Sequence, residues 1–351
     1  MTTQWSAFSR PHNPTAKCLH LVRLNQVTSR SELVTATGLS QPTVTRAIAA
    51  LIGAGYVTER TDLTRSQGRG RPIIPLELTD TQAIHAGIAV GTGSTYAALF
   101  DIKGRTIRDS ELDIHVADMS QDDFIQHIMA GLNRLMADLS RPLATVGVTT
   151  SGSVSPDGVV NAPNLGWKDA PFGSEMREQF SVPVQVTSAV AAIIGSEIQS
   201  ALTVDSAPMM ALFADDSIGA AVTQDKGVLP IAVDRPDLTT RGVLGGQTLV
   251  DAVRVAEGDA SLRKKLDARA QQLGELAAGL MKEHSTPALV IAGSALIDDP
   301  LAPSLFARSV RSALPEASLR MIPTHREMVR DIARAVALDL VLREPLTVTT
   351  P

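Results

Sequence analysis

The sequence predicts an α/β protein in which a small, mainly helical unit over residues 1–80 precedes a larger α/β body with two lobes. Its 351 residues suffice for two or three compact domains, and 44% of them are hydrophobic, so a sizeable core can form. Helical periodicity dominates the first 55 residues, whereas short strands and helices alternate afterwards. Charge divides at a similar place, because residues 1–75 hold nine Lys and Arg against three acidic residues, and the other 276 hold 23 against 34.

Composition excludes several classes of protein. The single cysteine, Cys18, excludes an intramolecular disulfide and a cysteine-rich zinc module. No apolar run approaches the roughly 18 residues of a membrane span, and the polar start MTTQWSAFSRPHN is unlike a signal peptide, so we expect a cytoplasmic protein without a membrane partner. A basic unit joined to an acidic body is typical of a nucleic-acid reader attached to something else, with chance clustering of charge as the alternative.

Two helices are predicted at the start of the basic unit. The first covers residues 15–26 and carries Cys18 on its apolar face, where a small core residue is the simplest interpretation. Ser29 and Glu32 form a capping box that begins the second helix. Gly38 ends that helix, because glycine readily adopts the left-handed conformation of a C-cap.

A third helix begins after Ser40, with Pro42 in its first turn, where the missing N–H costs nothing. Its apolar residues recur at helical spacing on one side: Val44, Ala47, Ile48, Leu51 and Ile52. The other side presents short polar and basic side chains near the helix start, as base readout in the major groove requires. We therefore predict a helix-turn-helix that contacts DNA through Ser40, Gln41, Thr43, Thr45 and Arg46. A helical hairpin that does not touch DNA is the alternative.

A wing is predicted after the third helix. Residues 56–60 and 73–78 are expected to pair as strands around the loop TDLTRSQGRGRP, which carries Arg65, Arg69 and Arg71. Glycines let the backbone approach a duplex, and arginines suit the negative potential of a narrow A·T-rich minor groove. A loop that contacts phosphates alone is the alternative.

The body begins with three successive strands and then alternates helices and strands, the order of a ribonuclease-H-like, actin-like core. The predicted strands cover residues 85–90, 96–102, 106–115, 145–150, 184–186, 209–213, 218–223 and 288–292. The predicted helices are one that begins after Ser120 and others over residues 172–180, 189–200, 247–256, 261–283 and 326–342. We expect a first lobe over 81–200, closed by a C-terminal helix within 323–351, and a second lobe over 201–322.

At this point the chain resembles the ROK group of repressors, open reading frames and sugar kinases. The resemblance rests on GLSQPTVTRAIAALIGAGYV and GRGRP in the basic unit, and on VGVTTSGSVSPDGVVNAPNLGW and AVAAIIGSE in the body. The order of parts is similar to that of the group's N-acetylglucosamine- and glucose-responsive repressors. The resemblance implies a winged helix-turn-helix followed by a two-lobe actin-like body, and a role in transcription.

The chain departs from the group's kinases at the positions that carry chemistry. Their first phosphate loop contains Asp-Leu-Gly-Gly-Thr, whereas the matching residues 89–93 contain no carboxylate. Ala189 replaces the aspartate that activates the sugar hydroxyl, and alanine cannot accept a proton. Asp215 and Asp216 stand in the second phosphate loop, where they would repel a nucleotide. The zinc segment matches residues 239–243 without a cysteine, and the Glu/His loop before it is shortened away. We therefore predict no catalytic residue, no metal and no cofactor.

The resemblance also implies a ligand between the lobes, near Ser151, Gly152, Asn164 and Ser188. Backbone donors after the strand could meet ligand hydroxyls, and Asn164 supplies a donor and an acceptor. In the alternative, Asn164 only braces the turn over residues 163–167. Because the family's acidic sugar ligands are missing, we expect free neutral sugars to bind poorly, and a phosphorylated sugar or another metabolite to be the effector.

These features predict a sequence-specific transcription regulator that acts as a repressor. One winged head makes few contacts, so we expect a homodimer or a higher oligomer bound to double-stranded DNA at an inverted repeat with A·T-rich flanks. Two alternatives are a ROK sugar kinase with an accessory head and a scaffold that binds DNA and oligomerises without a ligand.

Overall fold

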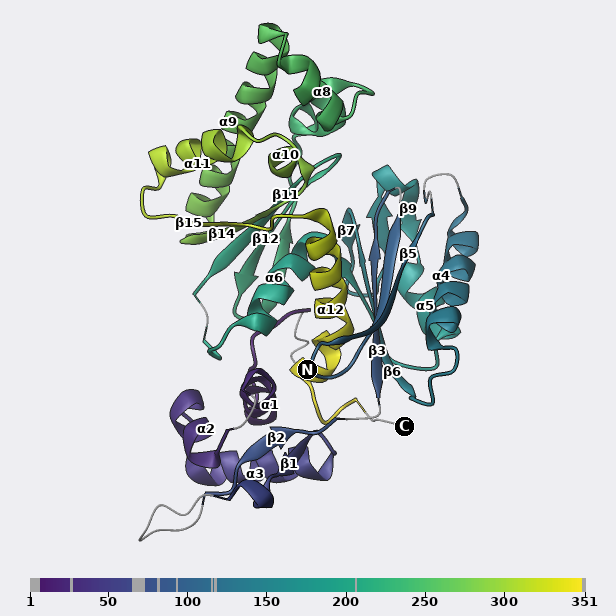
Figure 1. The fold of residues 1–351 in the computed structure, drawn as a ribbon, viewed down its shortest axis with the longest axis vertical. Coiled ribbons are helices and arrows are strands. Elements are labelled where there is room, and N and C mark those ends of the chain that lie inside the picture. The colour runs from purple at the N-terminus through teal and green to yellow at the C-terminus, as the bar shows by residue number, and fades with distance from the viewer. Residues whose placement is uncertain are drawn as a thin grey trace.

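The computed structural model describes residues 7–25, 28–64, 73–80, 83–92, 94–114, 116, 119–205 and 207–348. A small helical head lies at one end of the molecule, and two sheets with their helices form the body (Figure 1). The fold is therefore the α/β fold that the sequence predicts, with a helix-turn-helix head before a body of two sheets.

Three helices and a two-stranded hairpin make up the described part of the head. The helices are α1 (Pro14–Leu24), α2 (Arg30–Thr37) and α3 (Gln41–Gly53), and the antiparallel strands are β1 (Val57–Glu59) and β2 (Leu76–Leu78), with a 3-10 turn at Thr61–Leu63. The predicted caps are confirmed, because the Ser29 and Glu32 capping box is present and Gly38 is left-handed at φ 67°.

The first body sheet has the strand order β10-β6-β3-β4-β5. Strands β3, β6 and β10 are parallel, and β4 is antiparallel to both of its neighbours. Helices α4 and α5 pack against one face of this sheet, and α6 and α12 pack against the other. The elements of this half are β3 (Ile84–Val90), β4 (Thr95–Phe100), β5 (Thr106–Leu112), α4 (Gln121–Met136), β6 (Leu143–Thr150), α5 (Phe172–Gln179), β10 (Val184–Ser188) and α6 (Ala189–Ser200).

The second sheet repeats this arrangement in the order β13-β12-β11-β14-β15, with the same pattern of strand directions. Helices α9 and α11 cover one face of it, and α6 lies against the other. The elements are β11 (Met209–Ala214), β12 (Ile218–Gln224), β13 (Gly227–Ile231), a 3-10 turn at Pro236–Leu238, α7 (Thr240–Leu244), α8 (Leu249–Ala256), α9 (Ala260–Glu283), β14 (Ala288–Ala292), α10 (Ser294–Ile297), α11 (Ala302–Ala313) and β15 (Ser318–Met321). Two sheets with the same ribonuclease-H-like order confirm the actin-like arrangement.

The last helix, α12 (His325–Arg343), lies against the first sheet through two glycines. Gly87 of β3 and Gly147 of β6 are register partners. A Cβ at Gly87 would lie 2.1 Å from the carbonyl oxygen of Ala333, and one at Gly147 would lie 2.4 Å from that of Val336. The helix backbone therefore packs directly on the two central strands, where only glycine leaves room.

Some helices and several short strands are absent from the sequence-based prediction. They include β13, β15, α11 and a small antiparallel sheet of β7 (Ser153–Val154), β8 (Val160–Ala162) and β9 (Trp167–Ala170), which follows β6. These strands have two to five residues, too few for a clear alternating pattern.

Candidate nucleic-acid interface

The start of α3 is fixed by its own polar residues. Ser40 is the N-cap, and its Oγ accepts a hydrogen bond from the Thr43 N–H at 3.4 Å and lies 2.8 Å from Thr43 Oγ1. Ser40 is exposed and Thr43 half-buried. Both hydroxyls therefore already bond within the cap, although each retains capacity for a phosphate oxygen.

Three of the predicted contact residues project from the solvent side of α3. Gln41, Thr45 and Arg46 are exposed, whereas Val44 and Ile48 are completely buried on the opposite side. The amphipathic pattern thus presents one long amide, one hydroxyl and one guanidinium to solvent. These are donors and acceptors suited to base edges.

The base of the predicted wing is held by internal ion pairs. Arg60 donates to both carboxylate oxygens of Asp62, at 2.8 and 2.7 Å, and also pairs with Glu77 of β2. Arg30 pairs with Glu59 at 2.6 Å. These two arginines therefore form ion pairs within the head. The count of basic residues in the sequence does not indicate this. The wing residues Arg65, Arg69 and Arg71 lie outside the described residues.

The head is docked on the body through a shared core. Leu19, Leu33 and Ile48 of the head belong to the same buried cluster as Leu338 and Val341 of α12. Polar contacts reinforce this junction: the His20 ring nitrogen Nε2 lies 2.7 Å from the carbonyl oxygen of Ala201, and the Tyr56 hydroxyl donates to that of Val348 at 3.1 Å. The sequence gives no indication of this docking, because it depends on residues far apart in the chain.

The predicted effector residues lie near the carboxyl ends of β6 and β10. Thr150 and Ser188 end these parallel strands as register partners, and Ser151 follows directly. Ser151 Oγ donates to Asn164 Oδ1 at 3.0 Å, so the loop after β6 is tied to the turn that contains Asn164. Ser188 caps α6 and accepts from the Ala191 N–H at 3.4 Å.

Gly152 adopts φ 78°, and a Cβ there would lie 2.1 Å from the carbonyl oxygen of Asn161. This glycine therefore serves the close approach of two backbones. The hydrogen bonds of Ser151, Asn164 and Ser188 agree with a bracing role. These side chains also lie near the carboxyl ends of parallel strands, where ligands bind in open α/β sheets.

Two further hydroxyl groups near these strand ends are absent from the sequence-based prediction. Thr95 and Thr150 are completely buried, and their Oγ1 atoms have no hydrogen-bond partner among the described residues. Thr95 begins β4 beside the end of β3, and Thr150 ends β6. A position at a strand end is the sequence feature that could have indicated them.

The residues that match the catalytic and phosphate-binding positions of the group's kinases have other surroundings in this structure. Ala189 begins α6, directly after Ser188. Asp215, in the turn after β11, accepts a short hydrogen bond of 2.5 Å from Ser294 Oγ. Burial, followed by the neighbouring charge of Asp215, raises the pKa of Asp216. This acidic turn is unfavourable for a nucleotide phosphate.

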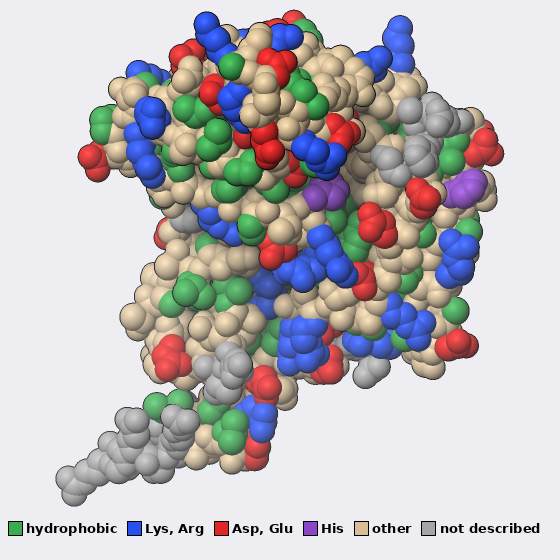
Figure 2. Space-filling model, turned by 45° about the horizontal axis from the view of Figure 1, so that its top comes forward, with side chains coloured by type: hydrophobic (Ala, Val, Ile, Leu, Met, Phe, Trp, Pro, Cys, Tyr) green, Lys and Arg blue, Asp and Glu red, His purple; other side chains and the backbone are tan. Residues whose placement is uncertain are grey.

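The described residues contain no group of three or more His, Cys, Asp and Glu side chains that could hold a metal ion. Among the helices described, none has both the length and the apolar character that a membrane span requires. Basic and acidic side chains are interspersed over the body face in Figure 2, with basic groups gathered near its centre. Ion pairs of the body include Arg320 with Glu197 and Arg334 with Asp331.

Residues 85–229 match the family model described as "ROK family". The chain carries a ROK family domain. The head with its exposed α3 residues precedes the matched residues in the chain.

Proteins similar to this chain include regulators. A transcriptional regulator of Mycobacterium tuberculosis (strain ATCC 25618 / H37Rv) is 30% identical over 212 residues, which cover 59% of this chain and 48% of the relative. The xylose repressor of Bacillus subtilis (strain 168) is 28% identical over 166 residues, covering 46% of this chain and 42% of the repressor. The chain thus matches about half the length of these relatives.

Solved structures of the ROK family share the fold. A ROK family transcriptional regulator, a homologue of the E. coli MLC protein, has a TM-score of 0.73 at 17% identity, with 95% of this chain and 98% of that chain covered. The ROK hexokinase of Thermus thermophilus has a TM-score of 0.61 at 16% identity, covering 73% of this chain and 99% of the hexokinase. The fold therefore occurs in both a regulator and a kinase.

Proposed function

We propose that this chain is a sequence-specific DNA-binding transcription regulator that acts as a repressor. The observation that carries the proposal is the capped α3, which presents Gln41, Thr45 and Arg46 to solvent from a head joined to the ROK domain. The names of the relatives support it, since they include a transcriptional regulator and a xylose repressor. Residues 1–80 form the DNA-binding unit in this proposal, 81–200 with the closing helix in 323–351 the first lobe, and 201–322 the second lobe.

The proposed contacts divide between two grooves. Gln41, Thr45 and Arg46 read base edges in the major groove, while Ser40 and Thr43 contact the backbone beside them. Arg65, Arg69 and Arg71 of the wing enter the adjacent minor groove, which favours A·T pairs. Double-stranded DNA is therefore the first partner, and a second copy of the chain supplies the other half of an inverted repeat.

The decisive experiment is genome-wide mapping of bound DNA, followed by titration of a mapped site at fixed salt. Replacing Arg46→Ala should weaken binding by about 1–3 kcal/mol, because one bidentate base contact is lost. The matched control is Arg254→Ala, which removes an exposed arginine of α8, 73% accessible in its side chain, and should leave affinity unchanged. Unchanged affinity in both variants would refute the α3 assignment.

We also propose that the ROK domain does not phosphorylate sugars. Ala189 cannot act as a base, and the Asp215–Ser294 hydrogen bond occupies the second phosphate loop. Purified protein should transfer no labelled phosphate from ATP to hexoses or amino sugars. Transfer that disappears in an Asn164→Ala variant would contradict this proposal and favour the kinase alternative.

The effector, in this proposal, is a phosphorylated sugar or a related metabolite bound at the carboxyl ends of β6 and β10. Ser151 and Asn164 support a polar ligand there, because both are only partly buried and offer a hydroxyl and an amide group. A ligand at 100 times its dissociation constant should stabilise the fold by roughly 2.7 kcal/mol, measured as a rise in Tm across a panel of sugars and sugar phosphates. Strong stabilisation by a free hexose, lost in Asn164→Ala, would overturn the expectation for neutral sugars.

A further inference from the structure

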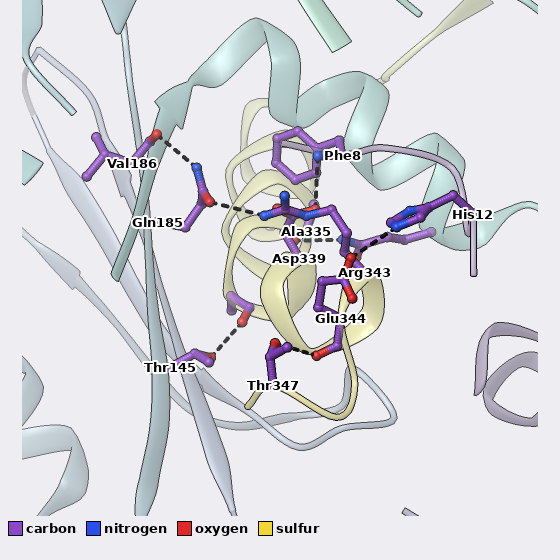
Figure 3. Close-up of polar contacts among 12 residues, drawn as sticks. Phe8, His12, Thr145, Gln185, Val186, Ala335, Asp339, Arg343, Glu344 and Thr347 are labelled. Atoms are coloured by element: carbon purple, nitrogen blue, oxygen red, sulfur yellow. Dashed lines mark hydrogen bonds and ion pairs between the residues drawn. The ribbon is translucent and has the colours of Figure 1, made fainter. Parts of the chain in front are cut away.

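The segment Ala7–Asn13, here named the junction strap, contacts the body and the head in turn. At its beginning, the Val228 N–H of β13 donates to the carbonyl oxygen of Ala7 at 3.2 Å. One residue later, the Phe8 N–H donates to Asp339 Oδ1 of α12 at 2.9 Å (Figure 3). At its end, Asn13 caps α1, the first helix of the head, by accepting from the Ala16 N–H at 2.7 Å. The strap therefore links an edge strand of the second sheet to the head.

Phe8 is the anchor of the strap. Its side chain is buried, 2% exposed, in the core cluster formed by α6 and α12. The ring packs directly on the backbone of α6, since a Cβ at Gly195 would lie 2.2 Å from Phe8 Cδ1. Phe8 also has φ 59°, a left-handed conformation that is uncommon for a residue with a side chain. Such a conformation persists only where surrounding contacts hold it.

Asp339 ties this anchor to the end of α12. The residue is 2% exposed, and its second carboxylate oxygen lies 3.2 Å from Arg343 Nη2. Just beyond, Glu344 pairs with His12 at 3.0 Å (Figure 3). Glu344 also accepts a hydrogen bond from Asn13 Nδ2 at 3.2 Å. The strap is thus bonded to the body at both ends. Ala7 and Phe8 make the first contacts, and His12 and Asn13 make the second, directly before α1 of the head.

Helix α6 makes this arrangement sensitive to the position of the two sheets. It contacts β6 and β10 of the first sheet as well as β11, β12 and β13 of the second, and it packs against α12. A rotation of one sheet relative to the other must therefore displace α6, β13 or α12, and each of these contacts the strap.

We propose that the junction strap couples the relative position of the two body sheets to the orientation of the DNA-binding head, with Phe8 as the positioning residue. The regulatory meaning of this coupling rests on the proposed function, whereas the mechanical link does not. A ligand that changes the position of the sheets would move the head through the strap, and DNA that fixes the head would restrain β13, because coupling between two sites is reciprocal.

The mechanical link can be tested without DNA. A dye is attached through Thr58→Cys, an exposed position of β1, in a Cys18→Ala background of the full chain. With the strap unaltered, the time-resolved fluorescence anisotropy of the dye should decay at the rate at which the whole molecule rotates. In Phe8→Ala the decay should contain an additional, faster component, because the head then moves independently. Phe180→Ala, which truncates a buried phenylalanine of the first-sheet core, is the matched control and should add none.

Phe8→Leu provides a milder variant, which should give a smaller fast component if Phe8→Ala does not fold. Identical anisotropy decays for the unaltered chain and the folded Phe8 variants would overturn the proposed role of the strap. A fast component that also occurs in Phe180→Ala would overturn it too, because general loosening of the body would then be sufficient.

Reciprocity is tested by hydrogen exchange on the full chain with a mapped operator duplex as the probe. Bound DNA should slow exchange of the Val228 amide, which donates to the strap, and this slowing should be smaller in Phe8→Leu at a DNA concentration that saturates the variant. Slowing of the same size in Phe8→Leu, or no slowing in the unaltered chain despite bound DNA, would overturn the coupling. If no DNA binds at all, the proposed function fails, and the anisotropy measurement still decides the mechanical link.

Discussion

At the scale of single residues, His85 shows how a titratable group becomes part of a core. It is 1% exposed, and its Nδ1 lies 2.8 Å from Thr145 Oγ1. The Thr145 hydroxyl donates to the carbonyl oxygen of Ala337 at 2.9 Å, so it accepts from His85, which therefore carries its proton on Nδ1. Burial lowers the pKa of His85 to about 4. His20 at the head junction is similar, with burial lowering its pKa to about 4.

These two histidines predict a loss of stability in mild acid. In the unfolded chain they bind protons below about pH 6.5, whereas in the folded chain they stay neutral down to about pH 4. The free energy of unfolding should therefore be fully retained above pH 6.5 and decrease between pH 6.5 and 4, by about 3 kcal/mol for each histidine.

The measurement is urea denaturation at several pH values. His85→Asn keeps a donor toward Thr145 but cannot titrate, so it should reduce the slope of unfolding free energy against pH by about one proton, or about 1.4 kcal/mol per pH unit. The same slope in the variant and the unaltered protein would show that His85 does not contribute to the acid sensitivity.

At the scale of elements, α12 depends on glycines in the strands beneath it. Gly147→Ala would place a methyl group 2.4 Å from the backbone of Val336, and backbone cannot rotate aside as a side chain can. We expect a loss of about 1–3 kcal/mol in unfolding free energy from this overpacking, measured by urea denaturation.

A second glycine supplies the matched control for that substitution. Gly279 is exposed within α9, and a Cβ there would meet nothing within 4 Å. Gly279→Ala should therefore stabilise the protein by about 0.5–1 kcal/mol, because alanine favours helix. If both substitutions changed stability in the same direction, close packing of α12 would not explain the role of Gly147.

At the scale of the whole molecule, the proposed function requires two heads. A single head with the exposed α3 residues makes few base contacts, whereas two heads related by symmetry read half-sites about one helical turn, roughly 34–36 Å, or a multiple apart. We expect light scattering to give at least a dimer, and a mapped site to be an inverted repeat. A monomer at working concentration that binds a single half-site tightly would contradict this prediction.

The sequence by itself determined the local elements. The Ser29 and Glu32 capping box, Gly38 and the Ser40 cap all act through hydrogen bonds within three or four residues, so the helices of the head could be predicted closely. The alternation of strands and helices in the body followed from periodicity, and the exposed side of α3 followed from the positions of its apolar residues. The residues predicted to contact DNA or an effector stay predictions. Of the described ones, Gln41, Thr45 and Arg46 are exposed, and Ser188 ends β10 beside the end of β6.

Only the tertiary structure decided how these elements act together. The core that the head shares with α12 joins residues far apart in the chain. The Arg60–Glu77 pair, the Arg30–Glu59 pair and the Phe8–Asp339 hydrogen bond join residues 17, 29 and 331 positions apart. Short β13 and β15 likewise needed their neighbours to become the outer strands of the second sheet. Caps and periodicity depend on neighbours within a few residues, whereas these contacts depend on which distant surfaces pack together, and a spacing pattern carries no information about that choice.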